Sequence, residues 1–487
     1  MGITKQIIHC KMFFNKPIIP CKLVFIGGRE QMQRKDMRLT EGAVWKNIIL
    51  FALPLMIGNL FQQLYNTVDS IIVGNFIGKE ALAAVGSVDS IINTFIGFFS
   101  GLSAGAGVVI SQYYGAKDDE SVHKAVHSTI ALTLILSVII TALATLTTPF
   151  FLKLLGTPSD VWENSETYLG IYFLGSTGLL VYNMGSGILR AAGDSKRPLY
   201  FLIFSTIVNI TLDIVFIAVF DMGIAGAAWA TVIAEFLSAL LVLIVLSAEK
   251  DCYKIVWSKI RIDFPILKKI LSVGIPTAIQ MMITAFSNVL VQSYINFFGS
   301  AAMAGWSSYS KIDKICLLPL QSIGLAITTF IGQNIGAGER DRVIEGIKVA
   351  TKINVVISIT VVAFLWIFAP YLVLLFSKDE DVIRYGTLFL RLLGPFFICV
   401  GFNQIHNGAL KGAGNSKIPM IIMMSSFILF RQVYLFLITK IANNVYTVAL
   451  GYPLGWLLCT IILAIYYKHV DISKFSVVDA KAKTKAS

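Results

Sequence analysis

Charge is scarce in this sequence. Only 14% of its 487 residues are charged, whereas an ordinary soluble domain carries about 25%. Hydrophobic residues make up 56% of the chain. A soluble protein of this length would have too little polar surface to cover itself. The composition therefore argues against a soluble enzyme, a nucleic-acid-binding protein and a disordered chain.

The residue types that build metal, disulfide and nucleotide sites are also few. Six cysteines stand at positions 10, 21, 252, 316, 399 and 459, and no pair has the spacing of metal ligands or of a disulfide framework. The chain has five histidines and no Gly-x-x-x-x-Gly-Lys-Ser/Thr loop that would hold a nucleotide. We therefore expect no enzymatic activity, no cofactor and no certain metal site.

Long apolar runs are abundant instead. A helix that crosses a bilayer needs about 20 mostly apolar residues, and twelve such runs follow one another along the chain. They lie near 48–77, 86–111, 125–148, 168–189, 199–220, 224–247, 270–297, 306–335, 349–369, 385–409, 419–439 and 446–467. The runs are long rather than short and alternating, which argues against a transmembrane β-barrel. We predict an all-α integral membrane protein with twelve transmembrane helices.

The net charge of +12 is informative about orientation. If the N-terminus is cytoplasmic, the cytoplasmic segments hold 30 Lys and Arg residues and the opposite side holds 7. Such an excess marks the cytoplasmic side of a membrane protein. We therefore predict a multi-pass protein with both termini in the cytoplasm, and the positive charge requires no nucleic-acid partner.

The first 44 residues differ from the rest, because they are basic and contain no long apolar run. One interpretation is a cytoplasmic tail that lies near anionic lipid. Another is a start site placed too early, in which Gly27-Gly28-Arg29-Glu30 is a translated ribosome-binding site upstream of Met32 or Met37. The sequence leaves both interpretations open.

The two halves of the chain are copies of each other. A shift of 221 residues aligns LRAAGDSKRP (189–198) with LKGAGNSKIP (410–419), and it also pairs Gly78 with Gly299, Gln112 with Gln333 and Pro149 with Pro370. Each copy holds six spans, and an even number makes the repeats parallel. We predict two six-helix lobes around a central cleft, at 45–247 and 270–467, joined by a cytoplasmic linker at 248–269 and followed by a cytoplasmic tail at 468–487.

Several motifs, in this order and spacing, resemble one transporter family. They are LPLMIGNLFQQLYNTVDSIIVG (53–74), GKEALAAVG (78–86), SQYYGA (111–116) with its copy GQNIGA (332–337), the two Gly-x-Ser-Lys-x-Pro loops and NITLDIVFI (209–217). Over about residues 45–467 the chain resembles the multidrug and toxic compound extrusion (MATE) family, in particular its bacterial proton-linked (DinF-like) branch. The resemblance implies twelve helices in two lobes and cation-driven efflux of drugs or organic cations.

Acidic residues within the apolar runs of the first half are the main candidates for chemistry, because charges inside a membrane are costly. Tyr65 and Asp69 are four residues apart, as are Asn209 and Asp213, so each pair shares one helix face. If the two faces meet, the burial of neighbouring carboxyl groups favours binding of a proton by one of them. The same oxygens, with the Thr231 hydroxyl, also suit sodium.

The resemblance adds roles to these positions. It implies that Tyr65, Asp69, Asn209, Asp213 and Thr231 form a cation-coupling site in the first lobe, and that Tyr168 and Asn183 match positions near it. The sodium-driven branch instead carries acidic residues in its seventh helix, where this chain offers Gln280, Asn288, Gln292 and Asn296. This difference favours protons over sodium.

The candidates for the substrate cavity are Tyr168, Asn183, Glu235, Gln280 and Arg431. We expect a secondary active antiporter of the bacterial plasma (inner) membrane that works as a monomer. Its expected substrates are small organic cations or drugs, and it would exchange them for protons, with sodium as the other candidate coupling ion. A lipid-linked saccharide flippase is the alternative. Such a flippase would need a cavity rich in basic residues, whereas the first-lobe spans here are acidic.

Overall fold

The computed structural model describes residues 38–154 and 156–478, and every regular element there is a helix. Most of the expected N-terminal tail and the last nine residues of the C-terminal tail lie outside these ranges. The elements of the first half are α1 (Val44–Phe76), α2 (Lys79–Gly115), α3 (Asp119–Leu154), α4 (Ser159–Leu174), α5 (Ser176–Ala191), α6 (Lys196–Asp213), η3 (Ile214–Val219), α7 (Gly223–Ala248) and η4 (Trp257–Lys259). Those of the second half are α8 (Phe264–Asn296), α9 (Ser300–Ala337), α10 (Arg340–Leu374), α11 (Glu380–Leu393), η5 (Gly394–Phe396), α12 (Phe397–Gly412), α13 (Lys417–Met424), η6 (Ser425–Phe430), α14 (Arg431–Ile441), α15 (Val445–Ala449), α16 (Gly451–His469) and η7 (Ile472–Phe475).

All but one of the expected spans correspond to a helical segment that is long and apolar enough to cross a membrane. In the described part of the chain, 11 helices are long and apolar enough to cross a membrane. The remaining expected span, 168–189, falls on α4 and α5, which have 16 residues each and meet at Gly175. A Cβ atom at Gly175 would lie 2.3 Å from a Val232 methyl group, so the helix breaks where α7 packs closely against it. The expected all-α membrane fold is confirmed.

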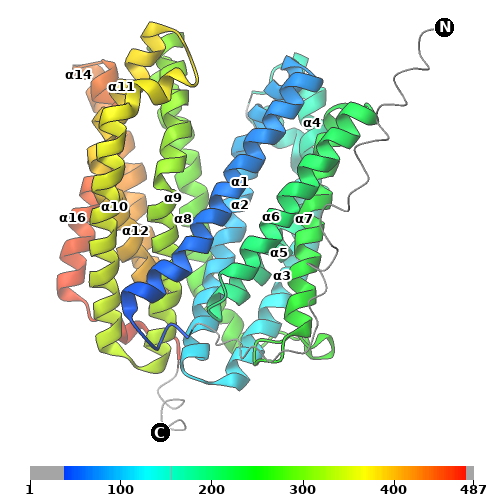
Figure 1. The fold of residues 1–487 in the computed structure, drawn as a ribbon, viewed down its shortest axis with the longest axis vertical. Helices are drawn as coiled ribbons and strands as arrows, with labels where there is room; N and C mark the ends of the chain where they lie inside the picture. Colours follow the sequence, from blue (N-terminus) through cyan, green and yellow to red (C-terminus); the bar gives the residue numbers. More distant parts are fainter. Residues whose placement is uncertain (1–37, 155, 479–487) are drawn as a thin grey trace, which may run out of the picture. The chain divides into compact units, whose positions relative to one another are not determined.

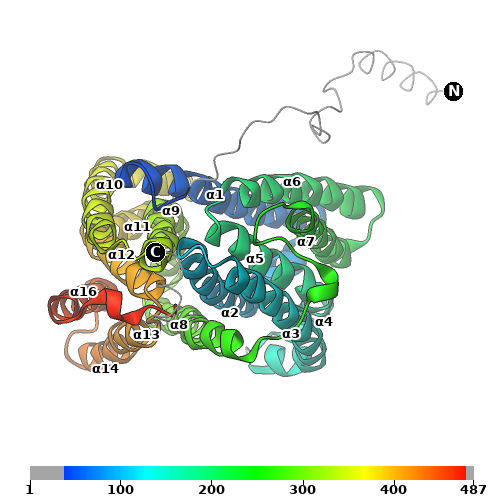
Figure 2. The same cartoon turned by 90° about the horizontal axis from the view of Figure 1, so that it is seen from below.

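The helices form two groups that follow the two halves of the sequence. Figures 1 and 2 show α2 to α7 on one side and α10 to α16 on the other, with α8 and α9 between them. The first group shares a hydrophobic core built around Phe99, Phe173 and Met184. The second has its own core around Trp306, Phe389 and Phe397.

The first helix of each repeat packs against both groups. Near its start, α1 places Ile48 and Phe51 against Phe330 of α9, whereas Val73 near its end belongs to the core of the first group. The start of α8 behaves in the same way, since Ile270 packs in the first core and Ile295 in the second. The repeats are therefore connected through the first halves of α1 and α8.

Helices α2 and α9 cross at two glycines that occupy equivalent positions in the repeats. A Cβ atom at Gly115 would lie 1.9 Å from the Gln333 carbonyl oxygen, and one at Gly336 would lie 1.9 Å from the Gln112 carbonyl oxygen. Only glycine allows the two backbones to approach this closely. The close contact between the halves therefore depends on these two positions.

We expect Gly115→Ala to destabilise the protein by about 1–3 kcal/mol, because the added methyl group forces the two helices apart. Gly86→Ala on the same helix is the matched control, since no atom lies within 4 Å of its Cβ position. The melting temperature of the purified protein in detergent would report both changes. Equal melting temperatures for the two variants would contradict the close crossing.

Beside this crossing, two glutamines of equivalent sequence position join the halves. Gln112 donates through Nε2 to the Gly412 carbonyl oxygen (2.8 Å), and Gln333 donates to the Ala191 carbonyl oxygen (2.8 Å). Each side-chain oxygen also accepts from a backbone N–H near one end of the described chain, from Val477 (2.8 Å) and from Leu39 (3.1 Å) respectively. We call Gln112 and Gln333 with these four bonds the glutamine latch.

The latch also places Leu39 and Val477 at the same end of the helices. A chain that begins and ends its membrane crossings on one side must cross an even number of times. This agrees with twelve crossings, in which α4 and α5 together make one.

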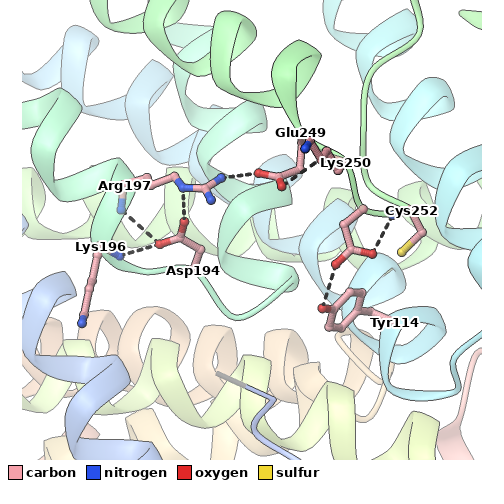
Figure 3. Close-up of polar contacts among 8 residues, drawn as sticks. Tyr114, Asp194, Lys196, Arg197, Glu249, Lys250 and Cys252 are labelled. Carbon is pink, nitrogen blue, oxygen red and sulfur yellow. Dashed lines mark hydrogen bonds and ion pairs between the residues drawn. The ribbon is translucent and has the colours of Figure 1, made fainter. Parts of the chain in front are cut away.

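The loop that Gln333 reaches is ordered by a small ionic network (Figure 3). Arg197 binds Asp194 through Nε (2.9 Å) and Glu249 through Nη1 (2.5 Å). Asp194 also accepts from the backbone N–H groups of Lys196 and Arg197. In the second repeat, Asn415 accepts in the same way from the Ile418 backbone, so in both Gly-x-Ser-Lys-x-Pro loops the residue before the N-cap serine accepts from a backbone N–H of the first helical turn.

Candidate coupling site

Two carboxyl groups meet inside the first group of helices. Asp69 near the end of α1 is 5% exposed, and Asp213 at the end of α6 is fully buried. Their side chains lie close to each other, and Asp69 Oδ1 and both carboxyl oxygens of Asp213 are buried without a hydrogen-bond partner among the described residues. Like charges repel strongly away from water, so a bound cation would stabilise the pair.

The neighbours of this pair are polar. Tyr65, one turn before Asp69, donates its hydroxyl to Thr231 Oγ1 on α7 at 3.0 Å. Asn209, one turn before Asp213, is fully buried, and both polar atoms of its side chain are without a hydrogen-bond partner among the described residues. The five residues expected from sequence to form a coupling site are therefore brought together by α1, α6 and α7.

Two tyrosines and a third acid extend the cluster. Tyr168 on α4 is 5% exposed and lies close to Asp69 and Tyr65. Tyr172, one turn later, lies close to Glu235 on α7, whose Oε2 atom is buried with no hydrogen-bond partner among the described residues. Sequence reasoning missed Tyr172, because nothing in its surroundings separates it from the other 16 tyrosines.

None of the ion pairs in the described part of the chain involves Asp69, Asp213 or Glu235. Buried carboxylates without a basic partner are costly, so the cluster is suited to taking up a cation. A proton needs only one oxygen. Sodium would need several oxygen ligands, which the two carboxylates, Asn209 and Thr231 can supply. No three His, Cys, Asp or Glu side chains gather as metal ligands within residues 38–154 and 156–478.

Asp213 lies at a change in helix type. The α-helical part of α6 ends at Asp213, and the π-helical segment η3 begins at Ile214. In the second half, the π-helical segment η6 ends at Phe430, directly before Arg431. A π segment carries an extra residue and therefore changes which side chains face inward, and such segments are frequent at functional sites. Each π segment here adjoins the buried charged residue of its own span.

A cavity of about 210 Å³ opens beside the same helices, nearer to the glutamine latch. It is lined by α1, α2, α5 and the start of α6 from the first half, with Met281 of α8 and three residues of α9. On α1 the lining residues Gly58 and Gln62 share a helix face with Tyr65 and Asp69. The cavity and the carboxyl cluster thus lie along one face of α1.

The remaining candidates lie apart from the cluster. Asn183 lines the cavity and donates to the Leu179 carbonyl oxygen (2.9 Å). Gln280 is buried in the second group of helices, where it contacts the Met423 sulfur. Arg431 is 3% exposed and donates to Ser287 Oγ (2.6 Å), and its guanidinium lies 4.5 Å from the Tyr452 ring centre. Neither Gln280 nor Arg431 lines the cavity.

Comparisons with known proteins agree with this arrangement. The MatE family model matches the chain twice, at residues 54–215 and 276–437. The probable multidrug resistance protein YpnP of Bacillus subtilis (strain 168) is 31% identical over 441 residues, which cover 89% of this chain and 97% of that protein. The two matches to the model lie one repeat apart, as the internal repeat of the sequence requires.

Solved structures also match over most of the chain. One is described as the outward-facing conformation of a multidrug resistance MATE family transporter of the MOP superfamily. It has a TM-score of 0.84 at 27% identity and covers 91% of this chain and 98% of its own. Another, a MOP superfamily transporter from Pyrococcus furiosus, has the same values, and its description states that reverse polarity of its binding pocket suggests a different function. With its two family matches and its two groups of membrane helices, the chain belongs to the multidrug and toxic compound extrusion (MATE) family of transporters.

Proposed function

We propose that this protein is a secondary active multidrug exporter that exchanges organic cations or drugs for protons by alternating access. The observation that carries the proposal is a pair of buried carboxyl groups, Asp69 and Asp213, which lie close together without a basic partner or a hydrogen-bond partner for three of their oxygens in the described chain. A group that needs a proton in one state and can release it in another can couple proton flow to transport. The multidrug resistance name of the Bacillus subtilis relative supports the substrate class.

The same helices connect this cluster to the cavity. On α1, Gln62 of the cavity and Asp69 of the cluster lie on one face. On α6, Leu202 lines the cavity and Asp213 at the end of the helix belongs to the cluster. When Asp69 and Asp213 lose or gain a proton, their mutual repulsion changes. This alters the packing of α1 against α6 and, with it, the cavity.

Protons supply enough free energy for this exchange. One charge that crosses about 150 mV releases about 3.5 kcal/mol, taking about 2.3 kcal/mol per 100 mV. Because about 1.4 kcal/mol corresponds to a tenfold ratio, one proton sustains a gradient of roughly 300-fold for a substrate without net charge. Exchange of one proton for one monovalent cation moves no net charge, so that exchange is driven by the pH difference alone. The proposal needs no ATP. It places the protein as a monomer in the bacterial plasma membrane, with both termini in the cytoplasm.

Sodium remains the other candidate coupling ion, since the oxygen ligands of the cluster suit either cation. Transport of ethidium into inside-out proteoliposomes of the purified protein would separate them. We expect uptake when the lumen is acidic, with the same rate in sodium and potassium buffers. Uptake that requires a sodium gradient would show that sodium, and not the proton, is the coupling ion. Uptake that needs no ion gradient would indicate a channel.

A further inference from the structure

The cavity contains one charged side chain. Among the residues that line it, only Arg190 near the end of α5 carries a charge, and none is acidic. The carboxyl cluster lies further along α1, outside the lining. An organic cation alone would therefore meet a repelling charge in this cavity.

Arg190 has no carboxylate partner in the described chain. Its Nη2 atom donates to Ser103 Oγ at 3.4 Å, and Ser103 in turn donates to the Asn183 carbonyl oxygen at 2.6 Å. The acid nearest to it in the sequence, Asp194, is bound by Arg197 instead. Most of the five N–H donors of this guanidinium are thus available to a bound molecule.

The lining also contains three side-chain amides. Asn59 and Gln62 on α1 line the cavity, and Asn183 does so from α5. Side-chain amides supply N–H donors to an anion, and the planar guanidinium matches a carboxylate with two parallel bonds. One positive charge and several N–H donors therefore make this cavity suitable for a ligand group that carries a single negative charge.

The size of the cavity sets how much of a ligand it holds. Its volume of about 210 Å³ is below the roughly 300–1,000 Å³ of pockets that enclose a whole drug-sized ligand. It suits one end of such a molecule. From Gln62 to Asp69 the face of α1 extends by about 10 Å, at 1.5 Å per residue, which a drug-sized molecule can span.

We propose that this cavity is a binding site for a carboxylate group, held by Arg190, and that it takes the carboxylate end of zwitterionic amphiphiles. The inference rests on the proposed export function, in which this site would hold the negative end of a substrate. A carboxylate is favoured over a pyrophosphate because one arginine balances one negative charge, whereas a pyrophosphate carries more.

Tetramethylrhodamine with a free carboxylate and its methyl ester form a matched pair of probes, since they differ only in the negative charge. Binding of each dye to the purified protein is measured by fluorescence polarisation, and uptake of each is measured in proteoliposomes. We expect Arg190→Gln to raise the Kd of the free acid by roughly tenfold to a hundredfold and to leave the Kd of the ester within about twofold. Arg190→Lys should retain part of the affinity, because it keeps the charge but loses the paired bonds.

Lys411→Gln is the matched control. Lys411 is the equivalent residue of the second repeat, it is 8% exposed, and it does not line the cavity. This variant should bind both dyes as the wild type does. If Arg190→Gln weakens the binding of the acid and of the ester equally, Arg190 has a structural role and the inference is overturned. The inference is also overturned if the wild-type protein binds the ester but not the acid. If the charge-selective binding is found but neither dye is transported, the inference holds and the export function fails.

Discussion

Asp213→Asn is expected to reduce pH-driven export by roughly two orders of magnitude, the usual scale for loss of a positioned proton-transfer group. Asp69→Asn should have a similar effect. Asparagine keeps the size of the side chain but cannot bind and release a proton near neutral pH. Because it can donate to the remaining carboxyl group, the helices should still pack, so a loss of export reports coupling rather than unfolding. Ethidium uptake into proteoliposomes under an imposed pH gradient is the measurement.

Asp160→Asn provides the control for these variants. Asp160 is an exposed acid at the start of α4 in the same half of the chain, and its loss should leave uptake unchanged. Undiminished pH-driven uptake by both Asp69→Asn and Asp213→Asn would remove these residues from the coupling site.

Gln112→Leu combined with Gln333→Leu is expected to open the end of the protein that carries the glutamine latch. Leucine has a similar volume but forms no hydrogen bonds. The buried backbone groups that each glutamine binds would lose their partners, at a cost of about 1–3 kcal/mol for each group left unsatisfied. Since about 1.4 kcal/mol is a tenfold change, each unsatisfied group should shift the equilibrium between closed and open states by roughly fivefold to a hundredfold, and the double variant should shift it by more than that.

Spin labels at Asp119→Cys and Glu339→Cys, in a background without the native cysteines, would detect this shift. Both positions are exposed and lie just after α2 and α9, on opposite halves. The double variant should increase the population with a long interspin distance. Gln292→Leu is the control, because Gln292 is partly exposed on α8 and, among the described residues, its side chain is bonded to its neighbour Asn296 alone. An unchanged distance distribution in the double latch variant would show that the latch does not hold the halves together.

Much of the fold could be predicted from the sequence because a membrane imposes simple rules. Backbone groups in a bilayer must bond within one helix, so the apolar runs correspond to helices. The break at Gly175 was not predicted, since it depends on the approach of Val232 from another helix. The packing of the first halves of α1 and α8 against the other repeat also depends on contacts between distant helices. The local order of apolar and polar residues therefore did not predict it.

The carboxyl cluster was predictable because spacing within a helix places side chains on one face. Tyr65 with Asp69 and Asn209 with Asp213 are such pairs, and the structure brings both faces together. Arg190 was not recognised as a cavity residue. Arg190 belongs to the repeated loop motif, so the sequence repeat already accounted for it and gave no indication that it lines a cavity.

The most direct test of the account is proton release on substrate binding by the purified protein in weakly buffered solution, compared in sodium and potassium salts. Coupling at Asp69 and Asp213 predicts release of about one proton per bound cation, equal in the two salts and lost in the Asp69→Asn, Asp213→Asn double variant. Release that persists in the double variant, or that occurs only in sodium, would contradict proton coupling at this site.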